Sequence, residues 1–576
     1  MAHRMASARS RLSTLKRLLT TYDDAAAESA DEPTVASVKL GCMALLGLRS
    51  LSTAQQVVDY HEALCFLRAH PDDSAVLAAA ENGLQQFSSR GDARRFRHEL
   101  ANSGMAGTDI HYPFFAPMAD WLAKTFGERL RIDWETVDDR AQAQLLAWIE
   151  SFVSPAELLG VFEEKLSVRD WIERLKGHDE SDGVFLVRCF EGLLATAPVR
   201  SRALEVLDLG YRLQGSEDGP SRTHARWPAS PVCFQTRPLR RARPDLSAAW
   251  KLAPQSIRAV SPRDGQRLID LAREAMVTRS RDLDSFAYGD PRDVRMVDCG
   301  EGLQFACIGL QHPQRNVLDA VYGFLTLMNG VPIGYVLASA LFSSSEIAYN
   351  VFATWRGGEA GYVYGRVIGM LHALFGSDAF TIYPYQLGHG NEEGLRSGSW
   401  WFYQKLGFRP RDPHCLQLMN RELAAMAKNK AHRSSRTTLK TLAAANMYWS
   451  PKADRDDIIG VFPFVGLSLA VSDLMAERFG SDRRRGERTL GDEAAARLGV
   501  RSRKRWPLVE RRAWDRWAPI LALLPGLERW TAASRKGLVA VVRAKGGRRE
   551  SDFVRLMDAH RPLRRALKAL AKRMGA

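Results

Sequence analysis

The first third of the chain repeats an apolar stripe at the spacing of a helix. The stripe is clearest in three segments, residues 52–70, 141–153 and 183–197. Apolar residues three and four apart lie on one helix face and can be buried there. Another helix is predicted at 154–166, because Ser154, Pro155 and Glu157 suit a helix cap and first turn. We therefore expect a helical domain over residues 1–215.

Beyond a linker rich in Gly, Ser, Pro and Arg at 216–245, the pattern changes to that of strands. Runs typical of strands occupy residues 256–260, 303–310, 320–327, 328–342, 346–355 and 379–386. Asn329 and Gly330 predict a tight hairpin turn. Helical stripes follow the first and the fifth of these runs. We expect residues 246–417 to form one domain around a mixed sheet.

Helical periodicity returns over residues 418–576. The predicted fold class is therefore α+β, a mixed central sheet with helices between an all-α N-terminal region and a basic all-α C-terminal region.

No apolar run is long enough to span a bilayer. The basic start, residues 1–19, has no apolar segment of a signal peptide behind it. Seven scattered cysteines without a CxxC pair favour a reducing compartment and no zinc site. We expect a cytoplasmic protein.

The net charge of +15 is concentrated at the end of the chain. Residues 481–576 contain 26 lysines and arginines against 10 acidic residues, whereas the rest of the chain is nearly neutral. Such a region can bind nucleic acid or an anionic surface. It can equally be a helical bundle with arginines outside and its tryptophans inside, which are Trp506, Trp514, Trp517 and Trp530. The sequence leaves these alternatives open.

The segment "WRGGEAGYVYGRVIGMLHALFG", residues 355–376, places glycines between a predicted strand and a predicted helix. Such a turn can serve only to change the chain direction. It can also leave backbone N–H groups free at a helix N-terminus, where they hold a phosphate.

The element order of residues 250–415 and this junction resemble the GNAT superfamily of acyl-CoA-dependent N-acyltransferases. The family's acyl-CoA loop reads Val-x-Pro-x-x-Arg/Gln-x-x-Gly-x-Gly/Ala, and "VFATWRGGEAG" matches it with alanine in place of proline. Without a gap, Glu359 and Gly361 occupy the last two places. With one residue deleted, Gly358 and Ala360 match instead.

The resemblance implies acetyl-CoA or a longer acyl-CoA as co-substrate, and no metal. The loop N–H groups would bind its pyrophosphate, whereas a carboxylate at Glu359 would oppose an anion. The implied cofactor-binding residues are Val351, Phe352, Arg356, Gly357, Gly358, Ala360, Gly361 and Asn391.

A second junction, "NEEGLRSGSWWFYQKLGF" at 391–408, resembles the family's Asn, small residue, Tyr and Lys-x-Gly-Phe pattern, with an insertion near 396–399. The resemblance implies that Tyr403 protonates the leaving CoA thiolate. Glu346 is the general-base candidate by its position on the strand before the loop. Tyr403 can instead be a core tyrosine, and Glu346 a solvated charge. His389, Glu392 and Glu393 lie in a turn that is expected to be solvated rather than a metal site.

Three functions remain open from the sequence. The first is N-acyl transfer from acyl-CoA to an amine. The second is a transferase of GNAT-like fold that uses aminoacyl-tRNA as its donor. The third is a non-catalytic GNAT-like binding scaffold.

Overall fold

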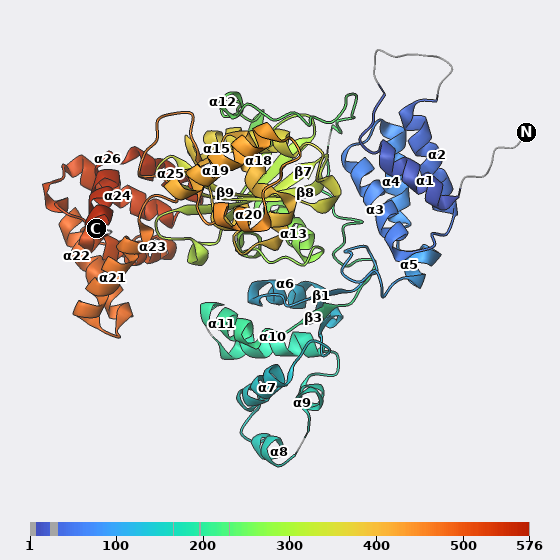
Figure 1. Cartoon of the computed structure of the whole chain (residues 1–576). Coiled ribbons are helices and arrows are strands. Elements are labelled where there is room, and N and C mark those ends of the chain that lie inside the picture. The colour runs from blue at the N-terminus through green and yellow to red at the C-terminus, as the bar shows by residue number, and fades with distance from the viewer. Residues whose placement is uncertain (1–6, 24–32, 165, 195–196, 230, 575–576) are drawn as a thin grey trace, which may run out of the picture. The chain divides into compact units, whose positions relative to one another are not determined.

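The computed structural model describes residues 7–23, 33–164, 166–194, 197–229 and 231–574 (Figure 1). The first six residues of the basic N-terminal segment lie outside the described part. The chain forms two compact units. Unit 1 comprises residues 1–239, 267–288 and 328–332, and unit 2 comprises residues 240–266, 289–327 and 333–576. Within the described residues, no helix has the length and apolar character needed to cross a membrane.

Unit 1 is mainly helical, as the apolar stripes predict. Its helices in the first half are α1 (Ala8–Leu18), α2 (Val35–Leu48), α3 (Ala54–Ala69), α4 (Ser74–Gln85) and α5 (Gly91–Arg95). The second half contains α6 (Ala116–Phe126), α7 (Asp139–Phe152), α8 (Leu158–Glu163), α9 (Val168–Leu175), α10 (Asp182–Leu193) and α11 (Ala197–Leu207). The chain also returns to unit 1 in part of α13 (Pro262–Val277) and in α14 (Asp284–Ala287).

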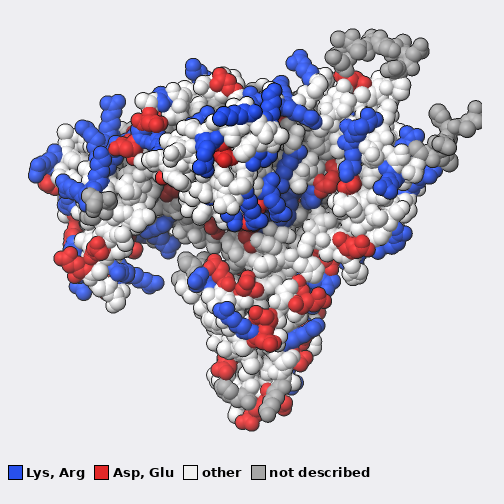
Figure 2. All heavy atoms as spheres, viewed as in Figure 1, with Lys and Arg blue, Asp and Glu red and all other residues white. Residues whose placement is uncertain are grey.

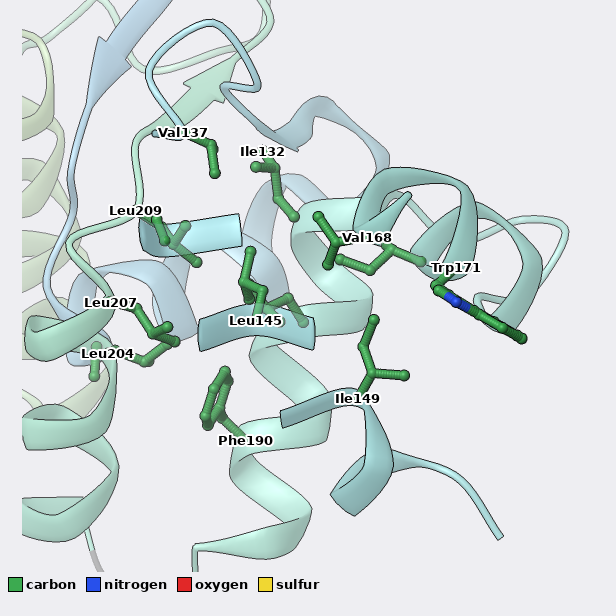
Figure 3. Close-up of a cluster of buried hydrophobic side chains, with 14 residues drawn as sticks. Ile132, Val137, Leu145, Ile149, Val168, Trp171, Phe190, Leu204, Leu207 and Leu209 are labelled. Carbon is green, nitrogen blue, oxygen red and sulfur yellow. The ribbon is translucent and has the colours of Figure 1, made fainter. Parts of the chain in front are cut away.

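The N-terminal region is not all-helical as expected. Three short strands, β1 (Ile110–Tyr112), β2 (Leu130–Ile132) and β3 (Tyr211–Leu213), form an antiparallel sheet with β3 in the middle. Three-residue strands carry too little alternation to be recognised in a sequence. Beside this sheet, α7, α9 and α10 enclose an apolar core that includes Leu145, Ile149 and Phe190 (Figure 3).

Unit 2 is built on a nine-stranded sheet. In spatial order its strands are β11, β12, β10, β9, β8, β7, β6, β5 and β4. In chain order they are β4 (Ser256–Ala259), β5 (Gly289–Asp298), β6 (Leu303–Leu310), β7 (Ala320–Met328), β8 (Val331–Leu341), β9 (Ser344–Val351), β10 (Ala379–Ile382), β11 (Arg409–Pro410) and β12 (Met447–Trp449). The predicted turn at Asn329 and Gly330 joins β7 to β8, and both residues have positive φ.

The β9 and β10 strands run parallel, joined by α15 (Ala360–Phe375), whereas β8–β9 and β10–β12 are antiparallel. A parallel pair needs such a crossover, and the apolar stripe of α15 is buried as predicted. The helices near the end of β10 are α16 (Pro384–Leu387), α17 (Glu392–Ser397), α18 (Ser399–Leu406), α19 (Pro413–Lys428) and α20 (Arg436–Leu442). A further short helix, α12 (Leu246–Ala249), packs against α15.

Two strand predictions are too long. The strand predicted at 379–386 ends at Ile382, because Pro384 begins α16. The strand predicted at 346–355 ends at Val351, and residues 353–355 form a 3₁₀ turn. The C-terminal region also departs from the all-α expectation, since it supplies β12, which lies between β10 and the edge strand β11.

The remaining C-terminal helices are α21 (Phe464–Phe479), α22 (Arg483–Leu498), α23 (Leu508–Leu523), α24 (Ala532–Lys545), α25 (Glu550–Ala559) and α26 (Arg561–Met574). Trp514 and Trp517 are fully buried, which confirms the bundle interpretation for these two residues. Several tail arginines form ion pairs, including Arg503 with Asp515 at 2.6 Å. Trp514 and Trp517 therefore help to build a core, whereas Trp506 and Trp530 are partly exposed.

Candidate functional site

A gap opens in the sheet where β9 and β10 part. The two strands pair over only three residues, the last pair being Glu346 and Thr381. Beyond that point, β9 continues to Val351 along β8, while the chain after β10 turns away into α16. Pro384 causes this turn, because its ring fixes φ and removes a donor that a strand would need. The edge of β9 from residue 347 to 351 is thereby left without a strand partner on this side.

A pocket of about 330 Å³ lies at this gap. Its walls come from the end of β9, the following loop, the start of α15 and the segment 386–403. The predicted site residues that line it are Val351, Arg356, Gly357, Ala360, Asn391 and Tyr403. One cavity therefore brings together residues that are far apart in the chain. They come from both junctions that resemble the GNAT superfamily, at 351–361 and 391–408.

The loop before α15 presents unpaired backbone donors. Gly357 adopts a φ of +83°, which favours glycine, and turns the chain toward the helix. Among the described residues, we find no hydrogen bond from the amides of Ala360, Gly361 or Tyr362, the first residues of α15. These N–H groups lie at the positive end of the helix dipole, which favours an anion.

The Glu359 carboxylate does not cap these donors. Glu359 is the residue before α15, and its side chain makes no capping hydrogen bond. Its Oε1 instead accepts a hydrogen bond of 3.0 Å from the backbone N–H of Arg240. Burial raises the pKa of Glu359, although Arg240 acts against this rise. Glu359 is thus held toward the segment at 240, away from the helix amides.

The loop arginine already has a partner. Arg356 forms an ion pair with Glu393 of α17, and its Nε donates to the carbonyl of Val351 at 3.0 Å. Both charged side chains are more than two-fifths exposed. An ion pair at this exposure contributes little to stability, about 0–1 kcal/mol, so an incoming phosphate can replace Glu393 as the partner. The insertion at 391–399 therefore forms one wall of the pocket and does not fill it.

Tyr403 is buried and lies on α18, with its ring against Tyr364 at a centroid distance of 5.6 Å and Phe408 at 5.9 Å. Burial raises its pKa far above the usual value for tyrosine. Within the described residues, its hydroxyl has no hydrogen-bond partner, and the side chain lines the pocket. Tyr403 thus keeps its proton at neutral pH and has a donor available.

Glu346 does not share this pocket. Alternation along β9 places Glu346 on the sheet face opposite Tyr349, which lines the cavity. Burial, with a smaller contribution from Asp319, raises the pKa of Glu346 to about 7. A carboxyl group that titrates near neutral pH is suited to accept a proton. Asn350, on the same face of β9 as Glu346, also lines the cavity, so the cavity reaches the face that carries Glu346.

The structure places three other predicted residues away from the cavity walls. Phe352 is buried against Tyr335. Gly361 faces the segment 242–244, since an added Cβ would lie 3.3 Å from Pro244. Gly358 is not part of the cavity wall. Of the two possible loop alignments, the second places one residue, Ala360, in the pocket.

Sequence reasoning missed several wall residues, among them Tyr349, Gln386, Ser397, Ser399 and Phe402. Alternation from Val351 back along β9 was a usable signal for Tyr349. The Tyr349 hydroxyl donates to the carbonyl of Ala360 at 3.0 Å and connects the pocket to the start of α15. Gln386 carried no signal, because its position depends on how α16 folds back.

Asn391 has a structural contact set in addition to its place in the wall. Its Oδ1 accepts from the Gly394 amide, and its Nδ2 donates to the Tyr385 carbonyl, each at 3.0 Å.

In the part of the chain that the structure describes, no group of three or more His, Cys, Asp or Glu residues is placed to hold a metal ion. Comparison with family models, curated proteins and solved structures finds no match for this chain, so the chemistry of the pocket must be inferred from its own residues.

Proposed function

We propose that the protein is an N-acyltransferase of the GNAT type, which moves an acyl group from acyl-CoA to an amine. The observation that supports this most is the set of free helix amides beside the gap between β9 and β10. The amides of α15 would hold the pyrophosphate, and the pantetheine arm would enter the gap. The unpaired edge of β9 would donate to the thioester carbonyl oxygen.

In this proposal the amine attacks the thioester carbon directly. The new C–N bond forms as the C–S bond breaks, and the products are the amide and the CoA thiolate, which then takes up a proton from solvent. Glu346 accepts the amine proton, through water where the distance requires it. Tyr403 donates a hydrogen bond to the leaving sulfur. Because the pKa of Tyr403 is raised, hydrogen bonding to the thiolate is favoured over complete loss of the phenol proton.

A second donor, aminoacyl-tRNA, is favoured by a different observation. Glu393 pairs with the loop arginine Arg356, so part of the positive charge that a small polyphosphate would use is already neutralised. We further propose that the protein resides in the cytoplasm, where thiols stay reduced, since all seven cysteines are free. The amine acceptor is a small molecule, a protein or a lipid-linked amine.

The test is calorimetric titration of the full chain with acetyl-CoA and longer acyl-CoAs. Ala360→Asp places a carboxylate among the free amides, whereas Ala360→Asn has the same size without the charge. We expect Ala360→Asp to weaken acyl-CoA binding at least tenfold, with a melting temperature equal to or above that of the wild type. An acidic residue in the first helical turn is stabilising by about 0.3–1 kcal/mol.

Ala360→Asn should bind within about threefold of the wild type. Equal binding by the two variants would show that the amides do not hold the cofactor. If the wild type binds no acyl-CoA but copurifies with RNA, the aminoacyl-tRNA donor is supported instead. Absence of both signals leaves a GNAT-like scaffold without catalysis.

A further inference from the structure

A basic surface lies on the segment that connects α19 to α20. We define it by five exposed side chains, Lys428, Lys430, Arg433, Arg436 and Lys440. The segment 428–440 contains no acidic residue. Figure 2 shows lysines and arginines gathered over this part of unit 2, in the middle of the view. Apart from Arg436, none of the five forms an ion pair within the described residues.

This surface is built on a fixed platform. The nearly buried Glu422 of α19 accepts hydrogen bonds from the Ser434 hydroxyl at 2.7 Å and from His432 at 3.0 Å. The indole N–H of Trp401 donates to the Ser434 hydroxyl at 3.1 Å. The Arg433 guanidinium also donates to the carbonyls of Lys430 at 2.9 Å and His432 at 2.8 Å. The chain between the two helices is therefore held in place, which lowers the entropic cost of binding a ligand there.

The basic surface borders the pocket. Arg436 forms an ion pair of 2.5 Å with Glu392, the first residue of α17, and both side chains are more than half exposed. The next residue, Glu393, lines the pocket wall. Trp401, which contacts Ser434, is likewise followed by a wall residue, Phe402. The α20 end of the basic surface therefore lies against α17, the helix that supplies part of the pocket wall.

Two tyrosines on the neighbouring helix are unusually exposed. Tyr383 and Tyr385 have exposed fractions of 55% and 53%. They lie at α16, which packs against α17 and α18. Tyr385 is connected to the pocket wall through the hydrogen bond from Asn391 to its carbonyl. Because α17 contacts both α16 and α20, one helix separates these rings from the cations of α20. Exposed aromatic rings together with cations form the combination that binds single-stranded nucleic acid, with cations along the backbone and rings stacked on bases.

We propose that α16, α17 and the basic surface bind the single-stranded end of an RNA at the mouth of the pocket. Arg436 and Lys440 lie four residues apart on one face of α20, and Thr437 and Thr438 add hydroxyl donors of the kind that contact phosphates. The row of cations along 428–440 is longer than one small anion requires. This inference does not depend on acyl transfer, because binding is measured without any donor or acceptor.

The test uses the full chain and a fluorescein-labelled, mixed-sequence single-stranded RNA of twelve nucleotides, followed by fluorescence anisotropy at several salt concentrations. The first variant is Lys430→Ala/Arg433→Ala/Lys440→Ala. Its matched control removes the same charge from exposed, unpaired tail residues, Arg501→Ala/Lys504→Ala/Arg505→Ala. Circular dichroism verifies that each variant is folded.

We expect the first variant to bind at least tenfold more weakly. Its salt dependence should also be shallower by about two, since each phosphate contact on a single strand contributes about 0.7 to the slope. The tail control should stay within twofold of the wild type. Tyr383→Ala/Tyr385→Ala should weaken binding at least about fivefold with an unchanged slope, because stacking releases no counterions.

Three results would overturn the proposal. The first is absence of RNA binding by the wild type at 50 mM salt. The second is an equal loss in the two triple variants, which would assign the binding to overall charge. The third is full retention of binding in the tyrosine variant together with equally tight binding of polyglutamate or anionic vesicles, which would identify a general polyanion surface.

Discussion

Burial raises the pKa of both residues proposed for catalysis, and the same rise suits each of them to a different role. Glu346 becomes a weaker acid, which makes it a base near neutral pH, with a pKa of about 7. Tyr403 also becomes a weaker acid, which keeps its hydroxyl protonated. Sequence reasoning proposed both residues but predicted neither shift, because burial and nearby charges, such as that of Asp319 acting on Glu346, are set by segments distant in the chain.

Glu346→Gln should remove a pH-dependent part of the activity. If Glu346 is the base, the kcat of acyl transfer should rise with pH to a plateau, with a midpoint near 7. The variant should lose about 10² to 10⁴ in kcat and should also lose this midpoint. A variant that keeps the wild-type pH profile would assign the base to another residue.

The same residue gives a readout that is independent of activity. The pKa of Glu346 rises on folding from 4.5 to about 7, so the folded state binds more protons between these values. The stability that Glu346 contributes is present below pH 4.5 and is lost as the pH rises to 7. Glu346→Gln should reduce this loss, by up to about 3 kcal/mol, as seen in melting temperatures at pH 5 and pH 8.

Tyr403→Phe should separate chemistry from binding. The variant removes only the hydroxyl and keeps the ring contacts with Tyr364 and Phe408. We expect kcat to fall about a hundredfold, with an acyl-CoA dissociation constant unchanged within threefold. Steady-state kinetics and calorimetry measure the two quantities. A loss of stability without a loss of kcat would show that Tyr403 is a core residue only.

At the scale of elements, periodicity predicted many helices and the strands β6, β7 and β8, but it missed the ten-residue strand β5, whose sequence GDPRDVRMVD is rich in charged residues. The strands β6 and β7 follow their apolar runs, and the helical stripe predicted after residue 260 is α13, where the Ser261 hydroxyl accepts from the Asp264 amide at 3.1 Å. Strand ends were predicted less well. The pocket depends on such an end, since β10 stops at Ile382 while β9 continues.

Leu145 and Leu146 of α7 provide a test of which face of a predicted helix is buried. Leu145 is fully buried in the cluster of Figure 3, whereas Leu146 is 42% exposed. Leu145→Ala should destabilise this part of unit 1 by about 2–5 kcal/mol, through lost burial and a cavity. Leu146→Ala should cost less than about 1 kcal/mol. Hydrogen exchange of peptides from α7, α9 and α10 measures both, and equal effects would contradict the packing.

At the scale of the whole molecule, unit 2 joins the sheet to the C-terminal helices through buried charges. Glu550 is fully buried, with its carboxylate 2.5 Å from Lys545 and 3.9 Å from Arg315. The Arg315 guanidinium also donates to the carbonyl of Gly547 at 2.6 Å. The C-terminal helices therefore form part of the same compact unit as the sheet.

Removing one member of this group should be costly. Glu550→Ala leaves two buried cations without their carboxylate, and we expect a loss of about 3–5 kcal/mol. Lys545→Met/Glu550→Leu, which removes an opposite-charge pair, should recover more than half of that loss. Thermal melting followed by far-ultraviolet circular dichroism compares the two. Equal melting temperatures for Glu550→Ala and Lys545→Met/Glu550→Leu would show that the charges of Lys545 and Glu550 are not coupled.

The sequence alone determined the helical stripes, the apolar strands, the hairpin turn and the two junctions that resemble a GNAT site, because these depend on near neighbours in the chain. Only the tertiary structure decided where β10 ends, that β12 enters the sheet, and that Glu359 points away from the helix amides. Only the tertiary structure showed which lysines and arginines of the basic surface form no ion pair within the described residues. Each of these depends on contacts between segments far apart in sequence, which periodicity and composition do not encode.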